Sequence, residues 1–266
     1  MTIYFLGGGN MATAIAQGLI KQGNHNIHIA NRSVEKREKL ARTLGVTVSE
    51  TLPALTKNDV LILAVKPQDM KAACAPIQTN GALILSVAAG LSIDTLSRYL
   101  GGTRRIIRTM PNTPSQIGLG ISGLFAEANI TESDKQQAEQ IMQAVGQTVW
   151  LQTENDIHAI TGISGSGPAY IFYLMNALSA AAEQQGFTPD AAKQLTLATF
   201  KGAVMLAEQS GEPFSTLQQQ VTSKGGTTYA ALQSFEQNRL AETIRQGVEA
   251  CVQRSQALAD EYSQNP

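Results

Sequence analysis

The fold of this chain is decided near its beginning, by the stretch Ile3-Tyr4-Phe5-Leu6-Gly7-Gly8-Gly9-Asn10-Met11-Ala12. Its apolar start predicts a buried strand, and the apolar residues that follow the glycines have helical spacing. Gly7 permits a tight turn, Gly9 lets the backbone approach a pyrophosphate, and Ala12 lets helix and strand pack closely. The first amides of the helix then favour an anion. A chance glycine cluster is the alternative, but the strand and helix on either side favour a dinucleotide-binding turn.

The first half of the chain alternates short β-branched runs with amphipathic segments, which is typical of repeated βαβ units. We expect strands at residues 3–6, 27–30, 46–48, 60–65, 82–87, 105–109 and 148–151. We expect helices that begin after Gly9 and near Val34, Leu52, Asp69 and Ser92, with a further helix over residues 131–145. These elements predict an α/β protein with an N-terminal Rossmann-type, doubly wound parallel sheet.

The second half has a different character. After about residue 154 the strand-like runs disappear, and long segments rich in Ala, Leu, Gln and Glu predict helices. We therefore expect an NAD(P)-binding Rossmann domain at residues 1–154 and an all-helical substrate and dimerisation domain at residues 155–266. Residues 168–185 are apolar or small on nearly every side, so this helix needs several packing partners. A second subunit would supply them, and we expect a homodimer or a larger homo-oligomer.

Composition excludes several classes of function. The net charge is −1 and no long basic run occurs, so we expect no nucleic-acid partner. No stretch approaches the roughly 20 apolar residues of a membrane span, and the N-terminus lacks a signal-peptide pattern. The two cysteines and three histidines are too scattered for a metal site. We expect a cytoplasmic protein without metal.

The end of the second expected strand bears on the choice of cofactor. An acidic residue there usually holds the ribose hydroxyls of NAD, but this chain has Asn31 and Arg32. A guanidinium can accept a 2′-phosphate, so we expect NADPH to be preferred and NADH to be a second donor. A solvated loop arginine is the alternative interpretation. Lys66 could likewise meet a phosphate, meet a substrate carboxylate or remain a surface lysine. The expected cofactor-binding residues are Leu6, Gly7, Gly9, Asn10, Met11, Asn31, Arg32, Ala64, Val65, Lys66, Pro67, Ala88, Ala89 and Gly90.

Three further motifs carry a resemblance to a known family. They are Arg108-Thr109-Met110-Pro111-Asn112-Thr113-Pro114, Ser164-Gly165-Ser166-Gly167-Pro168-Ala169-Tyr170 and Val221-Thr222-Ser223-Lys224-Gly225-Gly226-Thr227-Thr228. With the N-terminal turn and the loop after residue 63, they occur in the order found in pyrroline-5-carboxylate reductases, which the chain resembles over nearly its whole length. Lys224 departs from the family, in which many members carry proline.

The resemblance implies hydride transfer from NAD(P)H to C5 of 1-pyrroline-5-carboxylate, which yields L-proline in the last step of proline biosynthesis. It implies that Ser223, Gly226 and Thr227 hold the substrate carboxylate, with Gly225 in the same loop. Thr228 would reach the ring nitrogen as the catalytic residue. It also implies dimers with interleaved helical domains, often assembled into rings. From the residues alone, a Ser, Thr and Gly cluster before a helix is also compatible with a simple capping loop.

Two other functions compete with this interpretation. A β-hydroxyacid-type NAD(P) dehydrogenase also pairs a dinucleotide domain with a helical one, but it relies on a lysine in the first interdomain helix. Residues 168–185 contain no lysine. A non-catalytic dinucleotide-sensing protein would share the glycine-rich turn, although it would not need the motif at residues 223–228.

Overall fold

The computed structural model describes residues 1–23 and 26–264. Its contacts divide the chain into two compact units. The first contains Met1–Ser166 together with Cys251–Pro266, and the second contains Gly167–Ala250. Residues 155–166 and the end of the chain thus group with the first unit, whereas the division expected from sequence placed them with the second. The two units are described separately below.

The first unit is built on an eight-stranded sheet in the order β3-β2-β1-β4-β5-β6-β7-β8. Its strands are β1 (Thr2–Leu6), β2 (Asn26–Ala30), β3 (Thr47–Ser49), β4 (Val60–Leu63), β5 (Leu83–Ser86), β6 (Ile106–Met110), β7 (Gly120–Ala126) and β8 (Gly146–Trp150). Every neighbouring pair is parallel except β6 with β7. The order reverses between β1 and β4, which is the Rossmann arrangement and confirms the predicted fold class.

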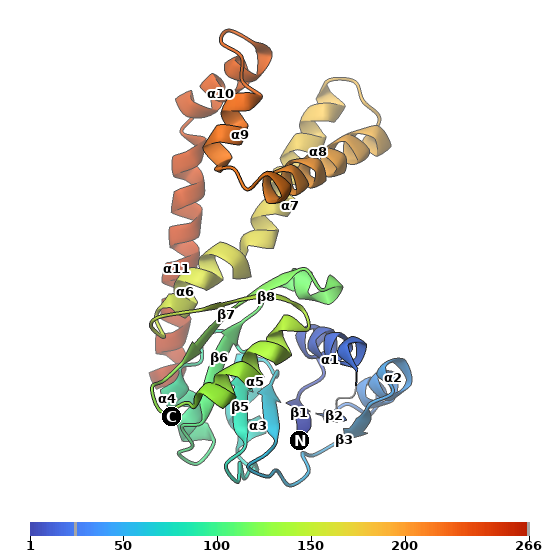
Figure 1. The fold of residues 1–266 in the computed structure, drawn as a ribbon, viewed down its shortest axis with the longest axis vertical. Helices are drawn as coiled ribbons and strands as arrows, with labels where there is room; N and C mark the ends of the chain where they lie inside the picture. Colours follow the sequence, from blue (N-terminus) through green and yellow to red (C-terminus); the bar gives the residue numbers. More distant parts are fainter. Residues whose placement is uncertain (24–25, 265–266) are drawn as a thin grey trace. The chain divides into compact units, whose positions relative to one another are not determined.

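Helices cover both faces of this sheet (Figure 1). They are α1 (Asn10–Gln22), α2 (Val34–Leu44), α3 (Pro67–Cys74), α4 (Ile93–Tyr99), α5 (Glu132–Gln143) and α6 (Asp156–Ile160), with a 3-10 turn at Thr113–Ile117 and a π-helical turn at Thr161–Gly165. Alternate residues of β4 serve the two faces. Ile62 joins a core with residues of α1, α2 and α5, while Leu63 joins one with residues of α3 and α4. Parallel strands buried in this way require the continuous apolar runs seen in the sequence.

Two expected features of the first unit differ in the structure. The helix expected near Leu52 is absent, because residues 52–56 form an irregular connection. Pro53 lies within it, and Asp59 accepts hydrogen bonds from the amide (2.9 Å) and hydroxyl (2.7 Å) of Thr56, which fixes a turn instead. Strand β7 was not expected, because Gly120 and Gly123 weaken its strand pattern.

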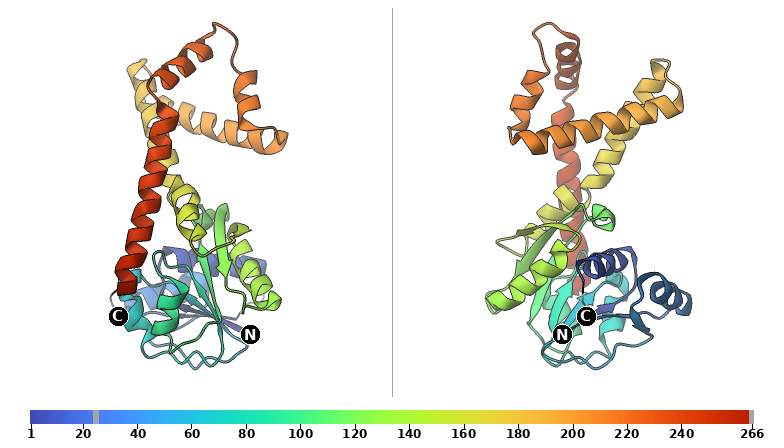
Figure 2. Two further views of the ribbon diagram at one scale, coloured as in Figure 1. Left: turned by 90° about the vertical axis from the view of Figure 1, so that its left-hand side faces the viewer. Right: turned by 45° about the vertical axis from the view of Figure 1, so that its right-hand side comes forward.

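The second unit is helical, as expected. It contains α7 (Gly167–Gln184), α8 (Pro189–Ser210), α9 (Phe214–Gln220), α10 (Thr227–Gln237) and the first part of α11 (Leu240–Gln264). Further views of these helices are given in Figure 2. Large apolar side chains stay exposed on α7, including Phe172 at 60% and Tyr173 at 75%. The helix therefore lacks, within one chain, the burial that its composition predicts. No helix in the described part of the chain is long and apolar enough to cross a membrane.

Candidate active site

The glycine-rich turn joins β1 to α1 and closes against the end of β4. The amide of Gly7 donates to the carbonyl of Ala30 (2.9 Å), and the amide of Ala64 donates to the carbonyl of Leu6 (2.9 Å). Gly7 has φ +102°, and an added Cβ would lie 2.8 Å from the carbonyl oxygen of Ala64, so only glycine fits there. At Gly9 an added Cβ would meet nothing within 4 Å. The turn is thus tight at Gly7 and open at Gly9.

A cavity of about 660 Å³ lies beside this turn, at the carboxyl ends of β1, β2 and β4. It brings together many of the residues expected to bind the cofactor: Leu6, Gly7, Gly9, Asn31, Arg32, Ala64, Val65 and Lys66. It is also lined by residues that the sequence did not single out: Gly8, Lys36, Glu50, residues 51–54, Asp69 and residues 76–78 with Asn80. Ligands of doubly wound folds bind where the strand order reverses, which is where this cavity lies.

The loop after β2 is held in place by Arg37, which the sequence did not indicate. Its guanidinium donates to the carbonyls of Asn31 (2.7 Å) and Arg32 (3.1 Å). Asn31 accepts from the amide of Ser33 (2.9 Å), and Ser33 caps α2. The side chain of Arg32 is 87% exposed and lies 3.7 Å from a carboxylate oxygen of Asp69. An exposed ion pair of this length is weak, so Arg32 is free to turn toward another anion.

The other expected cofactor residues do not line the cavity but lie on adjacent elements. Asn10 and Met11 begin α1, and Pro67 begins α3. Ala88, Ala89 and Gly90 follow β5, whose Ser86 is in register with Leu63 of β4. The amide of Val87 donates to the carbonyl of Leu63 (3.2 Å), so this loop emerges at the same edge of the sheet as the cavity.

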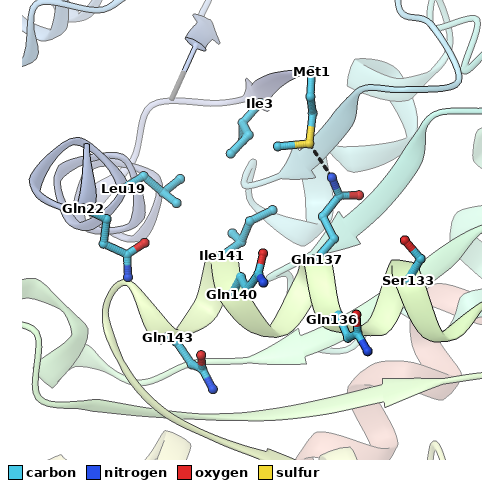
Figure 3. Close-up of a pocket in the computed structure, with 10 residues that line it drawn as sticks. All are labelled: Met1, Ile3, Leu19, Gln22, Ser133, Gln136, Gln137, Gln140, Ile141 and Gln143. Atoms are coloured by element: carbon cyan, nitrogen blue, oxygen red, sulfur yellow. Dashed lines mark hydrogen bonds between the residues drawn. The ribbon is translucent and has the colours of Figure 1, made fainter. Parts of the chain in front are cut away.

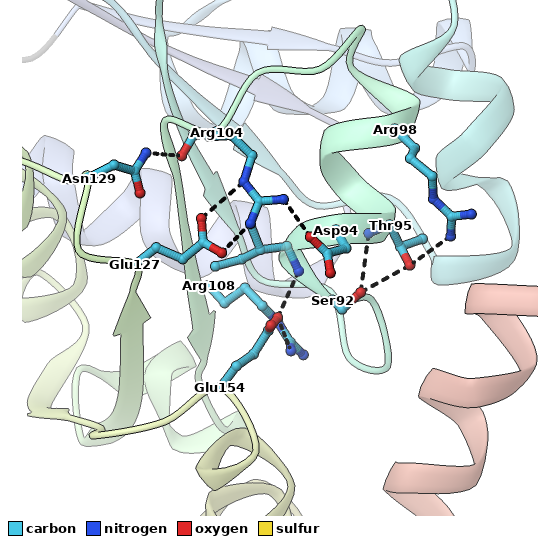
Figure 4. A network of polar contacts seen from close by, with 10 residues as sticks. Ser92, Asp94, Thr95, Arg98, Arg104, Arg108, Glu127, Asn129 and Glu154 are labelled. Carbon is cyan, nitrogen blue, oxygen red and sulfur yellow. Dashed lines mark hydrogen bonds and ion pairs between the residues drawn. The ribbon is translucent and has the colours of Figure 1, made fainter.

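A hydrogen-bond and ion-pair network that the sequence did not indicate joins β6 to the start of α4 and to the segment before α6 (Figure 4). Arg108 is 2% exposed, and its guanidinium contacts Glu154 at 2.8 Å. The same carboxylate oxygen accepts the amide of Ile93 (2.7 Å) at the start of α4. Burial lowers the pKa of Arg108, and Glu154 opposes that shift. The charge is therefore buried and depends on one carboxylate.

The Met-Pro-Asn motif has a structural role in the first unit. The side-chain amide of Asn112 donates to the carbonyl of Ser164 (3.1 Å) and accepts from the amide of Ile121 (3.0 Å). An added Cβ on Gly165 would lie 2.9 Å from the terminal methyl of Met110. The motif therefore fixes the π-helical turn at Thr161–Gly165, a kind of distortion that is frequent at functional sites.

The expected substrate loop lies in the second unit, at the start of α10. Gly225 has φ +72°, and Gly226 is the N-cap residue, with its amide bonded to the carbonyl of Ser223 (3.0 Å). Thr227 and Thr228 open the helix, so the amides of its first turn have no carbonyl partner within the helix. Ser223 and Thr227 are exposed, and Thr228 is half-buried. The loop thus presents hydroxyls and helix-start amides suited to a carboxylate.

Two other features are poor candidates for chemistry. A hollow beside Met1 is lined mainly by glutamines of α5 and apolar side chains, and it lies at the amino end of β1, away from the cofactor turn (Figure 3). Burial raises the pKa of the Cys74 thiol to about 12, so this thiol stays protonated and unreactive near neutral pH.

The fold, the turn and the cavity define a dinucleotide-binding protein, and the comparisons with known proteins make it an NAD(P)H-dependent oxidoreductase. Residues 2–90 match the family described as NADP oxidoreductase, coenzyme F420-dependent, and residues 154–258 match the one described as pyrroline-5-carboxylate reductase dimerisation. A pyrroline-5-carboxylate reductase of Pseudomonas aeruginosa is 41% identical over 268 residues, covering 98% of each chain. The chain belongs to the pyrroline-5-carboxylate reductase family.

Solved structures agree with this membership. A pyrroline-5-carboxylate reductase from Coxiella burnetii superposes with a TM-score of 0.88 at 38% identity and covers 97% of this chain and 98% of its own. The pyrroline carboxylate reductase of Plasmodium falciparum, solved with NADP bound, superposes with a TM-score of 0.84 at 27% identity, with the same coverage. Members of one family therefore cover 97 to 98% of the chain, including most of both units.

Proposed function

We propose that this protein reduces 1-pyrroline-5-carboxylate to L-proline with NADPH as its preferred hydride donor. The observation that carries the proposal is the open cavity at Gly9, at the reversal of the strand order, in a chain whose length is covered by pyrroline-5-carboxylate reductases. In this proposal residues 1–154 bind the cofactor, and residues 155–266 provide the substrate loop and the dimer contacts, as expected from the sequence.

The cofactor half fits a dinucleotide. The pyrophosphate has room at Gly9 and meets the amides that begin α1, where the helix dipole favours an anion. Asn10, Met11, Pro67 and the loop at Ala88 complete the contacts along the same edge of the sheet. Bound there, the nicotinamide supplies the hydride, and the residues of this chain only hold and orient it.

The substrate half rests on the loop before α10. Ser223, Gly225, Gly226 and Thr227 hold the carboxylate through hydroxyls and amides, and the hydroxyl oxygen of Thr228 accepts the N–H of the protonated ring nitrogen. A C=N bond accepts hydride readily once its nitrogen is protonated, so orientation and one hydrogen bond are the main demands on the protein. This agrees with a loop that offers hydroxyl groups and no strong acid.

The reaction is tested by mixing the purified protein with NADPH and 1-pyrroline-5-carboxylate. We expect the absorbance of NADPH to fall with one proline formed for each NADPH oxidised. Tight binding of NADPH without turnover would instead identify a dinucleotide-sensing protein. Oxidation of a β-hydroxyacid with NADP, and no reaction with the imine, would identify the other competing class.

The preference for NADPH rests on Arg32. Its side chain is exposed, lines the cavity and is held by Asp69 only through a weak contact, so it can pair with a 2′-phosphate. Lys36 lines the same cavity and adds a second positive charge. We expect Arg32→Ala to lower kcat/KM for NADPH about tenfold to a hundredfold while that for NADH changes less than twofold, since one charge-assisted hydrogen bond contributes about 1.5 to 3 kcal/mol. Equal losses with both cofactors would contradict the assignment.

Self-association follows from the family of residues 154–258 and from the exposed apolar face of α7. We propose a homodimer as the basic assembly, with larger rings built from it. Sedimentation equilibrium gives the oligomer number directly. We also propose a cytoplasmic location, consistent with a free buried thiol at Cys74, because reduced cysteines are usual there.

A further inference from the structure

The last turns of α11 pack against the loop that follows β5. A Cβ built on Gly90 would lie 3.4 Å from Cδ2 of Tyr262 and 3.5 Å from Cβ of Leu258. The ring edge of Tyr262 therefore borders the open side of Gly90, with space for about one methyl group between them. All of these residues belong to the first unit.

The loop is fixed at both ends, and the ring of Tyr262 borders its middle. At one end the amide of Val87 is bonded to Leu63, and at the other the side chain of Leu91 is fully buried. Between them Gly90 has φ +73°, a conformation that glycine adopts readily and that other residues disfavour. Glycine is also the most flexible residue, so something besides its own backbone must hold it. The ring of Tyr262 is the neighbour in position to do so.

The end of α11 is itself anchored at two further points. The imidazole of His158 lies 2.8 Å from the hydroxyl of Ser255, and Arg98 donates to the carbonyl of Ser263 (3.0 Å). Arg98 is also bonded to Thr95, which Ser92 contacts in turn at the start of α4 (Figure 4). Tyr262 joins the core formed by α3, α4, β4 and β5. The helix end is thus attached to α6, to α4 and to the core of the first unit.

We propose that Tyr262 is a positioning residue for the nicotinamide cofactor. The end of α11 holds the loop of Ala88, Ala89 and Gly90 in the conformation that receives the dinucleotide, without touching the dinucleotide itself. The inference rests on the proposed function, which assigns this loop to the cofactor. The atoms of Tyr262 that face Gly90 are ring carbons, so phenylalanine can replace tyrosine at position 262.

The test compares Tyr262→Ala with Tyr262→Phe. The dissociation constant of NADPH is measured by titration of the purified protein, and KM and kcat are measured with 1-pyrroline-5-carboxylate. We expect Tyr262→Ala to raise the Kd and KM for NADPH about five- to thirtyfold, the factor that fixing the backbone of one residue represents. We expect the kcat of Tyr262→Ala to fall less than threefold. The Kd, KM and kcat of Tyr262→Phe should stay within twofold of the parent values. Arg254→Ala, an exposed side chain on the same helix, is the control and should leave every constant unchanged.

A purely structural role predicts a different result. It would lower the thermal midpoint and the fraction of active protein but leave the Kd for NADPH unchanged, and that outcome overturns the inference. A Tyr262→Phe variant as weak as Tyr262→Ala overturns it as well. If Tyr262→Ala does not fold, Tyr262→Leu replaces it, with a threefold rise in Kd expected and no rise refuting the proposal. A parent protein that binds neither NADPH nor NADH refutes the proposed function together with the inference.

Discussion

Removing the carboxylate of Glu154 should destabilise the first unit strongly. The side chain of Arg108 is 3% exposed, and one of its terminal nitrogens is buried without a hydrogen-bond partner, so Glu154 at 2.8 Å is its compensating charge. Breaking a buried ion pair by removing one partner costs about 3 to 5 kcal/mol. Because the side chain of Glu154 is 31% exposed, water can reach the vacated space, and we expect Glu154→Ala to fall near 3 kcal/mol.

That free energy corresponds to a fall of about 6 to 12 °C in the thermal midpoint for a protein of this size. The measurement is thermal unfolding at one fixed protein concentration, because self-association also shifts the midpoint. Asp94→Ala is the matched control. It removes an exposed carboxylate that pairs with Arg104 and that lies beside Ile93 in the first turn of α4. Exposed ion pairs contribute about 0 to 1 kcal/mol, so the free energy of unfolding should fall by no more than that.

A second variant separates the two causes of the loss. Arg108→Met combined with Glu154→Gln removes both charges while leaving an acceptor for the amide of Ile93. We expect this double variant to recover to within about 1 kcal/mol of the parent, because paired removal avoids an uncompensated buried charge. If Glu154→Ala loses less than about 1 kcal/mol, the buried-charge reasoning is refuted. If the double variant is as unstable as Glu154→Ala, packing and not charge carries the effect.

Three further results are expected. Thr228→Ala should lower kcat/KM for 1-pyrroline-5-carboxylate about tenfold to a hundredfold, from one lost hydrogen bond, and an unchanged value in steady-state kinetics would remove Thr228 from the site. Gly146→Ala should lower the free energy of unfolding by about 2 kcal/mol or more, because Gly146 has φ +146° and an added Cβ would collide with the backbone of Gly120; urea denaturation measures it. Burial and then Arg108 lower the pKa of His158 below 6.5, against the opposing charges of Glu154 and Asp260. As the pH falls, His158 is therefore protonated in the unfolded chain before it is protonated in the folded one. Its contribution to the free energy of unfolding is complete above pH 6.5 and is lost as the pH falls below that value. In the same assay, His158→Gln should show a smaller loss of stability between pH 7 and 5.

Much of the first unit could be predicted from the sequence because its signals are local. The strand, glycine turn and helix at residues 3–20 follow from periodicity and from the backbone freedom of glycine, and the structure places them as expected. The helix expected near Leu52 is absent because Pro53 and the hydrogen-bonded turn at Thr56 override the helical tendency of this segment. Strand β7 was not expected because its glycines weaken the strand pattern. They are needed where neighbouring residues leave no room for a side chain. At Gly120 an added Cβ would collide with Ser115, a contact invisible in the local pattern.

The expected site residues divide in the same way. Leu6, Gly7 and Gly9 precede a helix in sequence, so their position at the cavity follows from the local pattern. Arg37 could not be found by that reasoning, because it acts on Asn31 through a backbone carbonyl and bears no motif. One signal was available: a basic residue on the first turns of a helix, shortly after the loop that it holds.

Periodicity tells which face of a helix is apolar but not what that face meets. Arg108 and Glu154 are separated by 46 residues, and although Arg108 begins one of the family motifs, nothing in the local sequence pairs it with Glu154. The packing partners of the end of α11 are likewise not visible in its local sequence. Its composition resembles that of the helical half, and it was expected there for that reason. Its hydrogen bonds with His158 and Arg98 and the packing of Tyr262 on the sheet core assign it to the first unit. If Tyr262 holds the cofactor loop, the residues that determine NADPH binding are spread over nearly the whole chain. A truncation that removes the end of α11 would then lower the affinity for NADPH, although it leaves every motif intact.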